Sequence, residues 1–416
     1  MVTPICLDYL DRQYTHLVRN MDSIKTTIAP NPPNTPGNET KATLSFPFLD
    51  LRAQFATIKD EILAAVTRVL DRQQFIMGPE VEALEAEFAN LIGCRFAVSC
   101  ASGSDALLLA LMALGVDSGD EVITTPFTFV ATAGSIARLK ARPVFVDIDP
   151  QTYNLDWIQL EAAITTRTKA IIPIHLFGLP AEMAKIMEVS SARGIPVIED
   201  AAQAIGARYE QKFVGNIGAC GCFSFFPSKN LGGAGDGGIV TTNDSDFADR
   251  LAVLRLHGSR RKYEYDLLGV NSRLDALQAA ILRVKLNHVN AWTAARRRNA
   301  ARYRELFEIT GLDRHLTVPV QPEGDLHVYH QFVIRTSHRN QLREHLRKCR
   351  IPTEVYYPAP LHLQPAFKYL GYKSGDFPRA ESACEQVLAL PIFPELAEEQ
   401  QTLVVDSIAQ FFAGKS

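Results

Sequence analysis

The sequence carries almost no excess charge of either sign. Its 43 lysines and arginines nearly balance 46 aspartates and glutamates, which gives the 416-residue chain a formal net charge of −3. Surfaces that bind nucleic acid or an anionic membrane generally show a marked basic excess. The composition therefore offers no electrostatic basis for either partner, and we expect the protein to bind neither nucleic acid nor membrane.

Long hydrophobic runs are missing as well. No apolar stretch reaches the ~18 residues of a membrane-spanning helix, and the N-terminus lacks the apolar segment of a secretory signal. The seven cysteines are scattered, and the close pair Cys220 and Cys222 has no second pair at zinc-ligand spacing. We therefore expect free thiols, no metal site and a cytoplasmic location.

Two familiar phosphate-binding motifs are absent or out of place. No P-loop of the form G-x-x-x-x-G-K-[ST] occurs. Residues 233–238 match the dinucleotide pattern G-x-G-x-x-G, but that pattern functions between a strand and a following helix. The apolar residues 239–242 that come next are typical of a strand instead. These observations disfavour a Rossmann dehydrogenase.

The sequence begins with a proline-rich segment, and alternating strand and helix patterns follow it. Residues 30–38 contain four prolines, too many for a helix or strand, so we predict a disordered tail or linker over residues 1–45. Segments with helical spacing are followed by segments whose patterns alternate between strand and helix. The sequence pattern changes after about residue 315. We predict a large α/β domain over residues 46–300 and a smaller α+β domain over residues 301–416.

A small-residue turn at Gly103 and Ser104 separates a short apolar strand from an apolar helix. Such a turn presents free backbone N–H groups at a helix N-terminus, which is a ready site for an anion, and the Ser104 hydroxyl could contribute. An ordinary helix cap is the alternative interpretation. Further on, Phe129 follows the strand at residues 121–124, where its ring could stack on a planar ligand or pack in the core.

A carboxylate stands at the end of the apolar strand that begins at Pro196. Ligands of open α/β sheets gather at the carboxyl ends of strands, and Asp200 could there pair with a pyridinium nitrogen and keep it protonated. Gln203 could reach a second substituent of the same ring. The alternative is a solvated carboxylate at the strand end, although an aspartate buried there would need a partner.

The most informative stretch is residues 222–238, in which a single lysine lies among aromatic and small residues. Desolvation lowers the pKa of such a lysine, so Lys229 could act as a neutral nucleophile and form a Schiff base with an aldehyde. Ser224, five residues earlier, could help to anchor a phosphate. A turn lysine beside glycines is the alternative. Together, the anion site, ring stack, carboxylate and amine match the needs of pyridoxal 5′-phosphate (PLP).

On these residues the chain resembles the DegT–DnrJ–StrS family of PLP-dependent nucleotide-sugar aminotransferases, from about residue 46 to the C-terminus. The resemblance implies the aspartate-aminotransferase (type I) fold, with a mixed, mostly parallel sheet in the large α/β domain and a smaller α+β C-terminal domain. It also implies a homodimer with composite active sites. The first 45 residues depart from the family pattern. The matching segments are residues 119–124, 126–129, 199–203, 224–229 and 271–275.

The resemblance also implies roles for the matching residues. Lys229 would bind PLP covalently, and Asp200 would pair with the pyridinium nitrogen. Gln203 would approach the ring hydroxyl, and Phe129 would stack on the ring. The phosphate would be bound by Gly103, Ser104, Ser224 and, across the subunit boundary, Asn271, which we place at the start of a long helix.

The activity implied is transfer of an amino group, from L-glutamate in most relatives, to a nucleotide-linked ketosugar in amino-sugar biosynthesis. The C-terminal features favour a 3-keto over a 4-keto sugar, and His330 and Tyr357 are candidates for the sugar side. One family branch has histidine in place of the lysine and performs dehydration, which Lys229 argues against. A keto-inositol aminotransferase and a non-catalytic PLP-binding regulator of the same fold are the alternatives.

Overall fold

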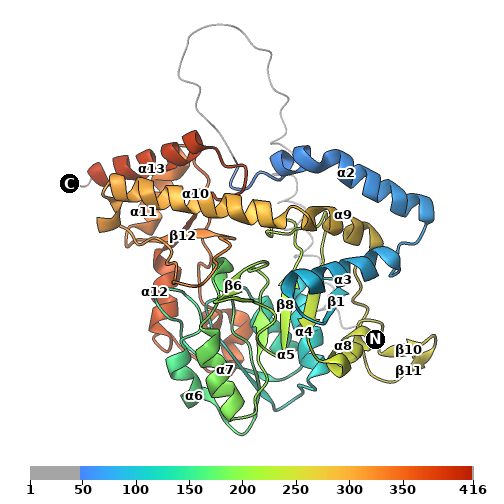
Figure 1. The fold of residues 1–416 in the computed structure, drawn as a ribbon. Helices are drawn as coiled ribbons and strands as arrows, with labels where there is room; N and C mark the ends of the chain where they lie inside the picture. Colours follow the sequence, from blue (N-terminus) through green and yellow to red (C-terminus); the bar gives the residue numbers. More distant parts are fainter. Residues whose placement is uncertain (1–46, 415–416) are drawn as a thin grey trace, which may run out of the picture. The chain divides into compact units, whose positions relative to one another are not determined.

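The computed structural model describes residues 47–414 (Figure 1), so the predicted tail lies outside the described residues. The described chain begins with two helices, α2 (Leu51–Arg72) and α3 (Pro79–Ile92). The Asp50 carboxylate caps α2 by accepting hydrogen bonds from the backbone N–H groups of its first turn. Proline at the first position of α3 costs no hydrogen bond, because that N–H would have no partner within the helix.

Two hydrogen-bonded strand groups, β1-β9-β8-β5 and β3-β2-β4, form the central sheet. Parallel bridges from Ile171 to Val197 and from Ile174 to Asp200 join the groups edge to edge. Strand β9 runs antiparallel to both neighbours and the other pairs are parallel, so the predicted mixed, mostly parallel sheet is confirmed. The strands are β1 (Phe96–Cys100), β2 (Glu121–Thr124), β3 (Arg142–Phe145), β4 (Thr168–Ile171), β5 (Ile198–Asp200), β8 (Cys220–Ser224) and β9 (Gly238–Thr242).

Strand β8 alternates between two apolar cores, one on each face of the sheet. Cys222 lies in the core with α4 (Gly103–Ala113), whereas Phe223 packs with α3 and α9 (Ala276–Leu286) on the opposite face. Because side chains alternate along a strand, Ser224 shares the face of α4. The alternation therefore brings the Ser224 side chain against the N-terminus of that helix, at Gly103.

Further helices and two short hairpins belong to the same part of the chain as the central sheet. The strand β9 follows the glycine-rich residues 233–237, as expected from the sequence, so these glycines do not open a helix. Two hairpins extend from the connections between larger elements. The remaining helices and hairpin strands of this part are α5 (Ala131–Arg138), α6 (Leu160–Ala163), α7 (Met183–Ala192), α8 (Ser245–Leu254), β6 (Arg208–Tyr209), β7 (Lys212–Phe213), β10 (Ser259–Arg261) and β11 (Glu264–Tyr265).

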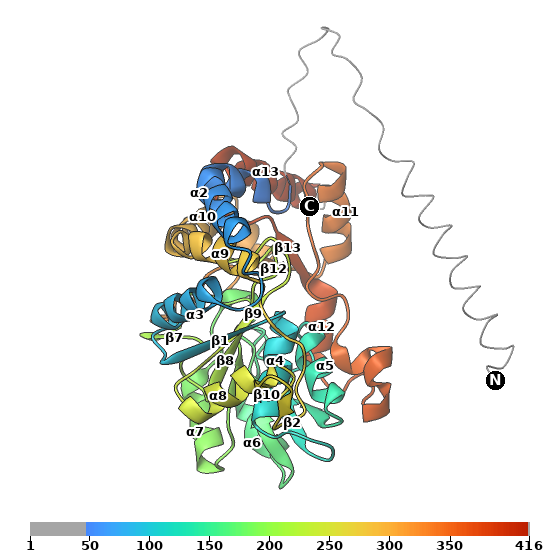
Figure 2. The same ribbon diagram turned by 90° about the vertical axis from the view of Figure 1, so that its right-hand side faces the viewer.

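Residues of the C-terminal part form an apolar cluster that includes Tyr303, Phe332 and Leu388. The long helix α10 (Val289–Ile309) packs along α13 (Glu398–Ala413), and α11 (Arg339–Lys348) lies against α13 as well (Figures 1 and 2). The proposed domain boundary at residue 300 falls inside α10 and stays a prediction. The remaining α-helix and strands of this part are α12 (Pro378–Gln386), β12 (Phe332–Arg335) and β13 (Val387–Leu390).

The predicted helix start at Asn271 is wrong. Asn271 pairs with Leu256, and Asp275 pairs with Ile76, in antiparallel bridges, so residues 271–275 are extended. Helix α9 begins only at Ala276. Tertiary pairing across the chain has overridden the local helical pattern.

None of the helices within residues 47–414 is long and apolar enough to cross a membrane.

Candidate active site

A cavity of about 490 Å³ opens where the carboxyl end of β5, the N-terminus of α4 and the loop after β8 meet. Its volume falls within the range of small-molecule sites. The structure brings to this one cavity nine of the ten site residues expected from the sequence, although they lie up to 254 positions apart, from 103 to 357. They are Gly103, Ser104, Phe129, Asp200, Gln203, Ser224, Lys229, His330 and Tyr357.

Lys229 supplies the amine of the cavity. Burial lowers the pKa of this lysine to about 8, and the nearby Asp200 carboxylate opposes the shift without cancelling it. Among residues 47–414, no hydrogen bond or ion pair engages the Lys229 Nζ atom. The amine is therefore available as a nucleophile, and a larger fraction of it is uncharged near neutral pH than for an ordinary lysine.

Asp200 ends β5 and is only 5% exposed. Burial raises the pKa of its carboxyl, and hydrogen bonds from Thr132 and the backbone of Ala202 together with the charge of Lys229 oppose the shift. Thr132 Oγ1 donates to Oδ2 at 2.8 Å, and the Ala202 N–H donates to Oδ1 at 3.2 Å. These contacts orient the carboxylate while leaving room for a further cationic partner in the cavity.

The N-terminus of α4 and the side chain of Ser224 form an anion cradle. Ser102 caps the helix by accepting the Asp105 N–H at 3.1 Å, and the first N–H groups of a helix have no intrahelical partner. A Cβ at Gly103 would lie 2.6 Å from the Ser224 Cβ. Glycine is therefore required for this close approach, which places backbone donors beside the Ser224 hydroxyl.

Gln203, Tyr357 and Phe129 line other parts of the cavity. The Gln203 carbonyl oxygen accepts the backbone N–H of Phe177 at 2.7 Å, and its Nε2 donates to the Tyr357 hydroxyl at 3.1 Å. The Phe129 ring is 56% exposed, so one of its faces is open to a ligand. Burial raises the pKa of Tyr357, which keeps its O–H available as a donor.

Asn271 is the one expected site residue that does not line the cavity. It is exposed and pairs through its backbone with Leu256. The expectation that it acts across a subunit boundary stays a prediction.

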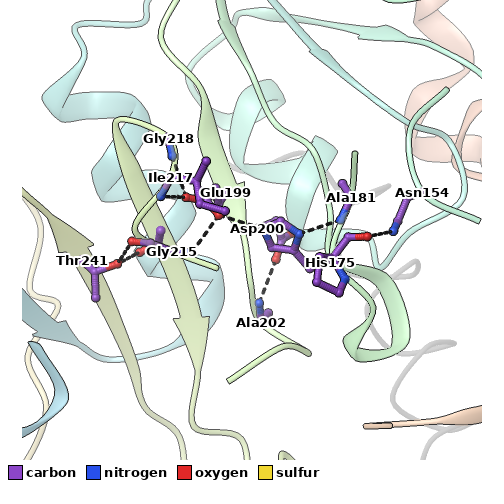
Figure 3. A network of polar contacts seen from close by, with 12 residues as sticks. Asn154, His175, Ala181, Glu199, Asp200, Ala202, Gly215, Ile217, Gly218 and Thr241 are labelled. Carbon is purple, nitrogen blue, oxygen red and sulfur yellow. Dashed lines mark hydrogen bonds and ion pairs between the residues drawn. The ribbon is translucent and has the colours of Figure 1, made fainter. Parts of the chain in front are cut away.

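A buried network behind the cavity fixes the strand that carries Asp200 (Figure 3). Glu199 is fully buried and accepts a hydrogen bond from Nε2 of the equally buried His175 at 3.0 Å. The backbone of the turn before β8 donates three more hydrogen bonds to the same carboxylate, from Gly215, Ile217 and Gly218 at 2.7, 2.8 and 2.7 Å. The network ties β5 to the turn and holds the following residue at the cavity edge.

Several residues in the cavity and in the network behind it were missed by the sequence analysis. Thr132 contacts a carboxylate 68 positions away, and nothing in its local sequence indicates that contact. Glu199 was quoted only as part of the motif around Asp200, although a charged residue inside an apolar strand is itself a signal of a buried partner. The other missed lining residues include Thr128, Phe226, Ser228, Asp236, Gln331 and Tyr356.

The fold and the cavity together define an aminotransferase of the PLP-dependent type I class. The chain belongs to the DegT/DnrJ/EryC1/StrS aminotransferase family, whose model matches residues 56–409. Solved relatives hold PLP or pyridoxamine phosphate, so PLP is the cofactor of this family.

Individual relatives are similar over nearly their whole length. A "pleiotropic regulatory protein" of Geobacillus stearothermophilus is 51% identical over 89% of this chain and 99% of its own. A UDP-N-acetyl-3-dehydro-alpha-D-glucosamine 3-aminotransferase of Acidithiobacillus ferrooxidans is 48% identical, with coverage of 89% and 99%. The solved DesV of Streptomyces venezuelae superposes with a TM-score of 0.86 at 43% identity, over 88% of this chain and 98% of its own.

The donor set of the cavity fits PLP. A desolvated amine suits an aldehyde, a buried carboxylate suits a pyridinium nitrogen, and a helix N-terminus beside a serine hydroxyl suits a phosphate.

Proposed function

We propose that the protein transfers an amino group from L-glutamate to C3 of a nucleotide-linked ketosugar, as a step in amino-sugar biosynthesis. The observation that carries the proposal is the pairing of the Lys229 amine with the Asp200 carboxylate in one cavity beside an anion cradle. Support for position 3 comes from the Acidithiobacillus ferrooxidans relative, whose name places the amino group there.

Different residues of the chain would have different roles in such a transfer. When bound, PLP supplies an aldehyde and an electron-accepting ring. Lys229 would hold the aldehyde and, once released from it, would carry a proton between the donor carbon and the cofactor through its Nζ atom. Asp200 would hold the proton on the ring nitrogen, aided by the Thr132 hydrogen bond that fixes its carboxylate.

The remaining cavity residues would bind and orient. Gly103, Ser104 and Ser224 would bind the phosphate of the cofactor, and Phe129 would cover its ring. Gln203 would lie toward the ring hydroxyl. His330 and Tyr357 would face the sugar.

We also propose a homodimer in which Asn271 completes the phosphate site of the partner subunit. Asn271 is exposed and lies outside the cavity of its own chain. The preceding hairpin region exposes apolar side chains, with Leu268 94% and Tyr263 77% accessible, which favours coverage by another subunit.

Two measurements test the proposal. Borohydride reduction of the purified protein, followed by peptide mapping, should leave the cofactor on Lys229. Amination assays with glutamate and dTDP-, UDP- and GDP-linked 3-keto and 4-keto sugars, with a keto-inositol as a further arm, should show turnover of a 3-ketosugar. A label elsewhere, or turnover of the keto-inositol alone, would contradict the proposal.

A regulatory role is the second candidate, and the name of the Geobacillus stearothermophilus relative favours it. A regulator of this fold would bind PLP at Lys229 yet aminate none of the ketosugars above. The same two measurements therefore separate the candidates, because labelling without turnover supports the regulator.

A further inference from the structure

His330 lies in a segment that is fixed by its neighbours. The Val328 N–H donates to the Gly178 carbonyl at 3.0 Å. The buried Arg296 guanidinium donates to the carbonyl of Tyr329 at 3.1 Å and to that of Ile392 at 2.8 Å. The His330 side chain is 7% exposed and lines the cavity. The ring therefore occupies a defined place beside the reacting groups.

Asn230, the residue after Lys229, determines which nitrogen of the His330 ring carries the proton. One end of the Asn230 amide lies 3.1 Å from the Val328 carbonyl oxygen, which can only accept a hydrogen bond. That end must be Nδ2, so the other end is the oxygen Oδ1. Oδ1 lies 3.2 Å from His330 Nδ1 and can only accept. Nδ1 must then be protonated.

In a neutral ring with a proton on Nδ1, Nε2 is an acceptor. Burial lowers the pKa of His330 well below its usual range, and the positive charges of Lys229 and Arg296 lower it further. The imidazole is therefore neutral at physiological pH. Among the described residues, no side chain or backbone group donates to Nε2.

The Tyr357 hydroxyl complements this acceptor. Because its oxygen accepts from Gln203 Nε2 at 3.1 Å, its own proton is directed elsewhere and can be donated. The cavity that holds the Lys229 amine thus also contains this acceptor and this donor. A ketone that carries a hydroxyl on a neighbouring carbon offers the complementary pair, since the hydroxyl donates and the carbonyl accepts.

We propose that Asn230 is a positioning residue that holds His330 with its proton on Nδ1, so that Nε2 accepts a hydrogen bond from a hydroxyl beside the reacting carbonyl of the ketosugar. This inference rests on the proposed function and narrows its substrate to an α-hydroxy ketone. A site built to bind a hydroxyl discriminates strongly against analogues that lack it.

A pair of substitutions at His330 tests the assignment. His330→Gln keeps an oxygen near the position of Nε2 and loses the contact with Asn230, whereas His330→Asn keeps a group that reaches Asn230 and loses the acceptor. We expect His330→Asn to raise KM for the ketosugar about tenfold, and His330→Gln to raise it less. The half-reaction with glutamate should be impaired less than amination of the ketosugar in both variants, because glutamate carries no hydroxyl on the carbon next to its reacting carbon. The reverse order of the two variants, or an equal slowing of the glutamate half-reaction, overturns the proposal.

The proton position is measured independently of turnover. In the ¹⁵N-histidine-labelled full chain, proton–nitrogen correlation spectra should show His330 protonated on Nδ1, with its signals assigned from their absence in His330→Gln. Asn230→Ala should disturb that tautomer and raise KM for the ketosugar. The control is Asn299→Ala, which removes a comparable amide contact, to the Phe393 carbonyl at 2.8 Å, and does not line the cavity.

Protonation of His330 on Nε2 in the unaltered protein refutes the positioning role, whatever the activity. Turnover of no ketosugar by the unaltered protein refutes the proposed function and with it the sugar contact, while the spectra still decide the role of Asn230.

Discussion

At the scale of single residues, burial decides the chemistry of the cavity. Lys229 and Asp200 carry opposite charges, yet burial moves the pKa of each toward its uncharged form. The desolvation of each group thus outweighs their mutual attraction. A cationic ring in the cavity would favour the ionised form of Asp200. The role of Asp200 therefore depends on the negative charge of its carboxylate and not on a hydrogen bond alone.

Asp200→Asn tests that dependence. The amide keeps the size of the side chain and can still accept from Thr132, but it cannot hold a proton on a ring nitrogen. We expect the fold to be retained and kcat to fall by roughly 100-fold or more, the scale of a lost electrostatic contact in an active site. Steady-state kinetics measures kcat, and circular dichroism measures whether the fold is retained. Asp246→Asn, in the exposed first turn of α8, is the matched control, and near-normal turnover of Asp200→Asn would refute the role.

The lowered pKa of Lys229 predicts how the apoprotein captures PLP. Only the neutral amine attacks an aldehyde, so the capture rate should rise with pH and level off above about 8, instead of near the ordinary lysine value of 10.5. Asp200 stabilises the ammonium, so Asp200→Asn should move the midpoint to lower pH. Stopped-flow absorbance from pH 6 to pH 11, a range that includes both the expected midpoint and the ordinary lysine value, measures both curves. A midpoint near 10.5 would show that Lys229 is not desolvated.

At the scale of secondary-structure elements, the cavity depends on strands that are fixed from behind. The Glu199 carboxylate joins β5 to the turn before β8 through three backbone donors and His175. These donors have no other acceptor if the carboxylate is lost, and unsatisfied buried donors are costly.

Glu199→Gln should therefore destabilise the protein. The amide nitrogen would face backbone donors in place of an acceptor oxygen, and we expect the free energy of unfolding to fall by about 3 kcal/mol. Urea unfolding of the unaltered protein and of Glu199→Gln measures the difference in the free energy of unfolding. The Glu188 side chain is 73% exposed and pairs with Lys185, so Glu188→Gln should change stability by less than about 0.5 kcal/mol. Equal effects of the two substitutions would show that the network contributes little.

The same elements show what a single sequence can predict. The pattern around Lys229 and Asp200 indicated the chemistry because a lone lysine and a strand-end carboxylate are local features. The contact of Thr132 with Asp200 was not predictable, since it joins elements 68 positions apart. The helix start at Asn271 was misplaced for a similar reason, because its pairing with Leu256 is a tertiary contact that local periodicity cannot report.

At the scale of the whole molecule, the proposed composite site needs two chains. Lys229 and Asp200 line the cavity of one chain, whereas Asn271 is exposed outside it. If Asn271 contributes to the partner's phosphate site, Asn271→Asp should weaken PLP binding, because a second negative charge would face the phosphate. Neither Asn271→Asp nor Lys229→Ala should then be active alone.

Mixing the two inactive variants tests the composite arrangement. In a mixed dimer, one site would carry both substitutions and the other would carry neither, so one site is intact. Random exchange of subunits makes about half of the dimers mixed, and activity should recover to about a quarter of the unaltered level. Mixing Lys229→Ala with Asp200→Asn provides the matched control, since both residues belong to the same cavity and every site would keep one substitution. Recovery in the first mixture and none in the second identifies Asn271 as the partner's contribution, whereas no recovery in either would confine the site to a single chain.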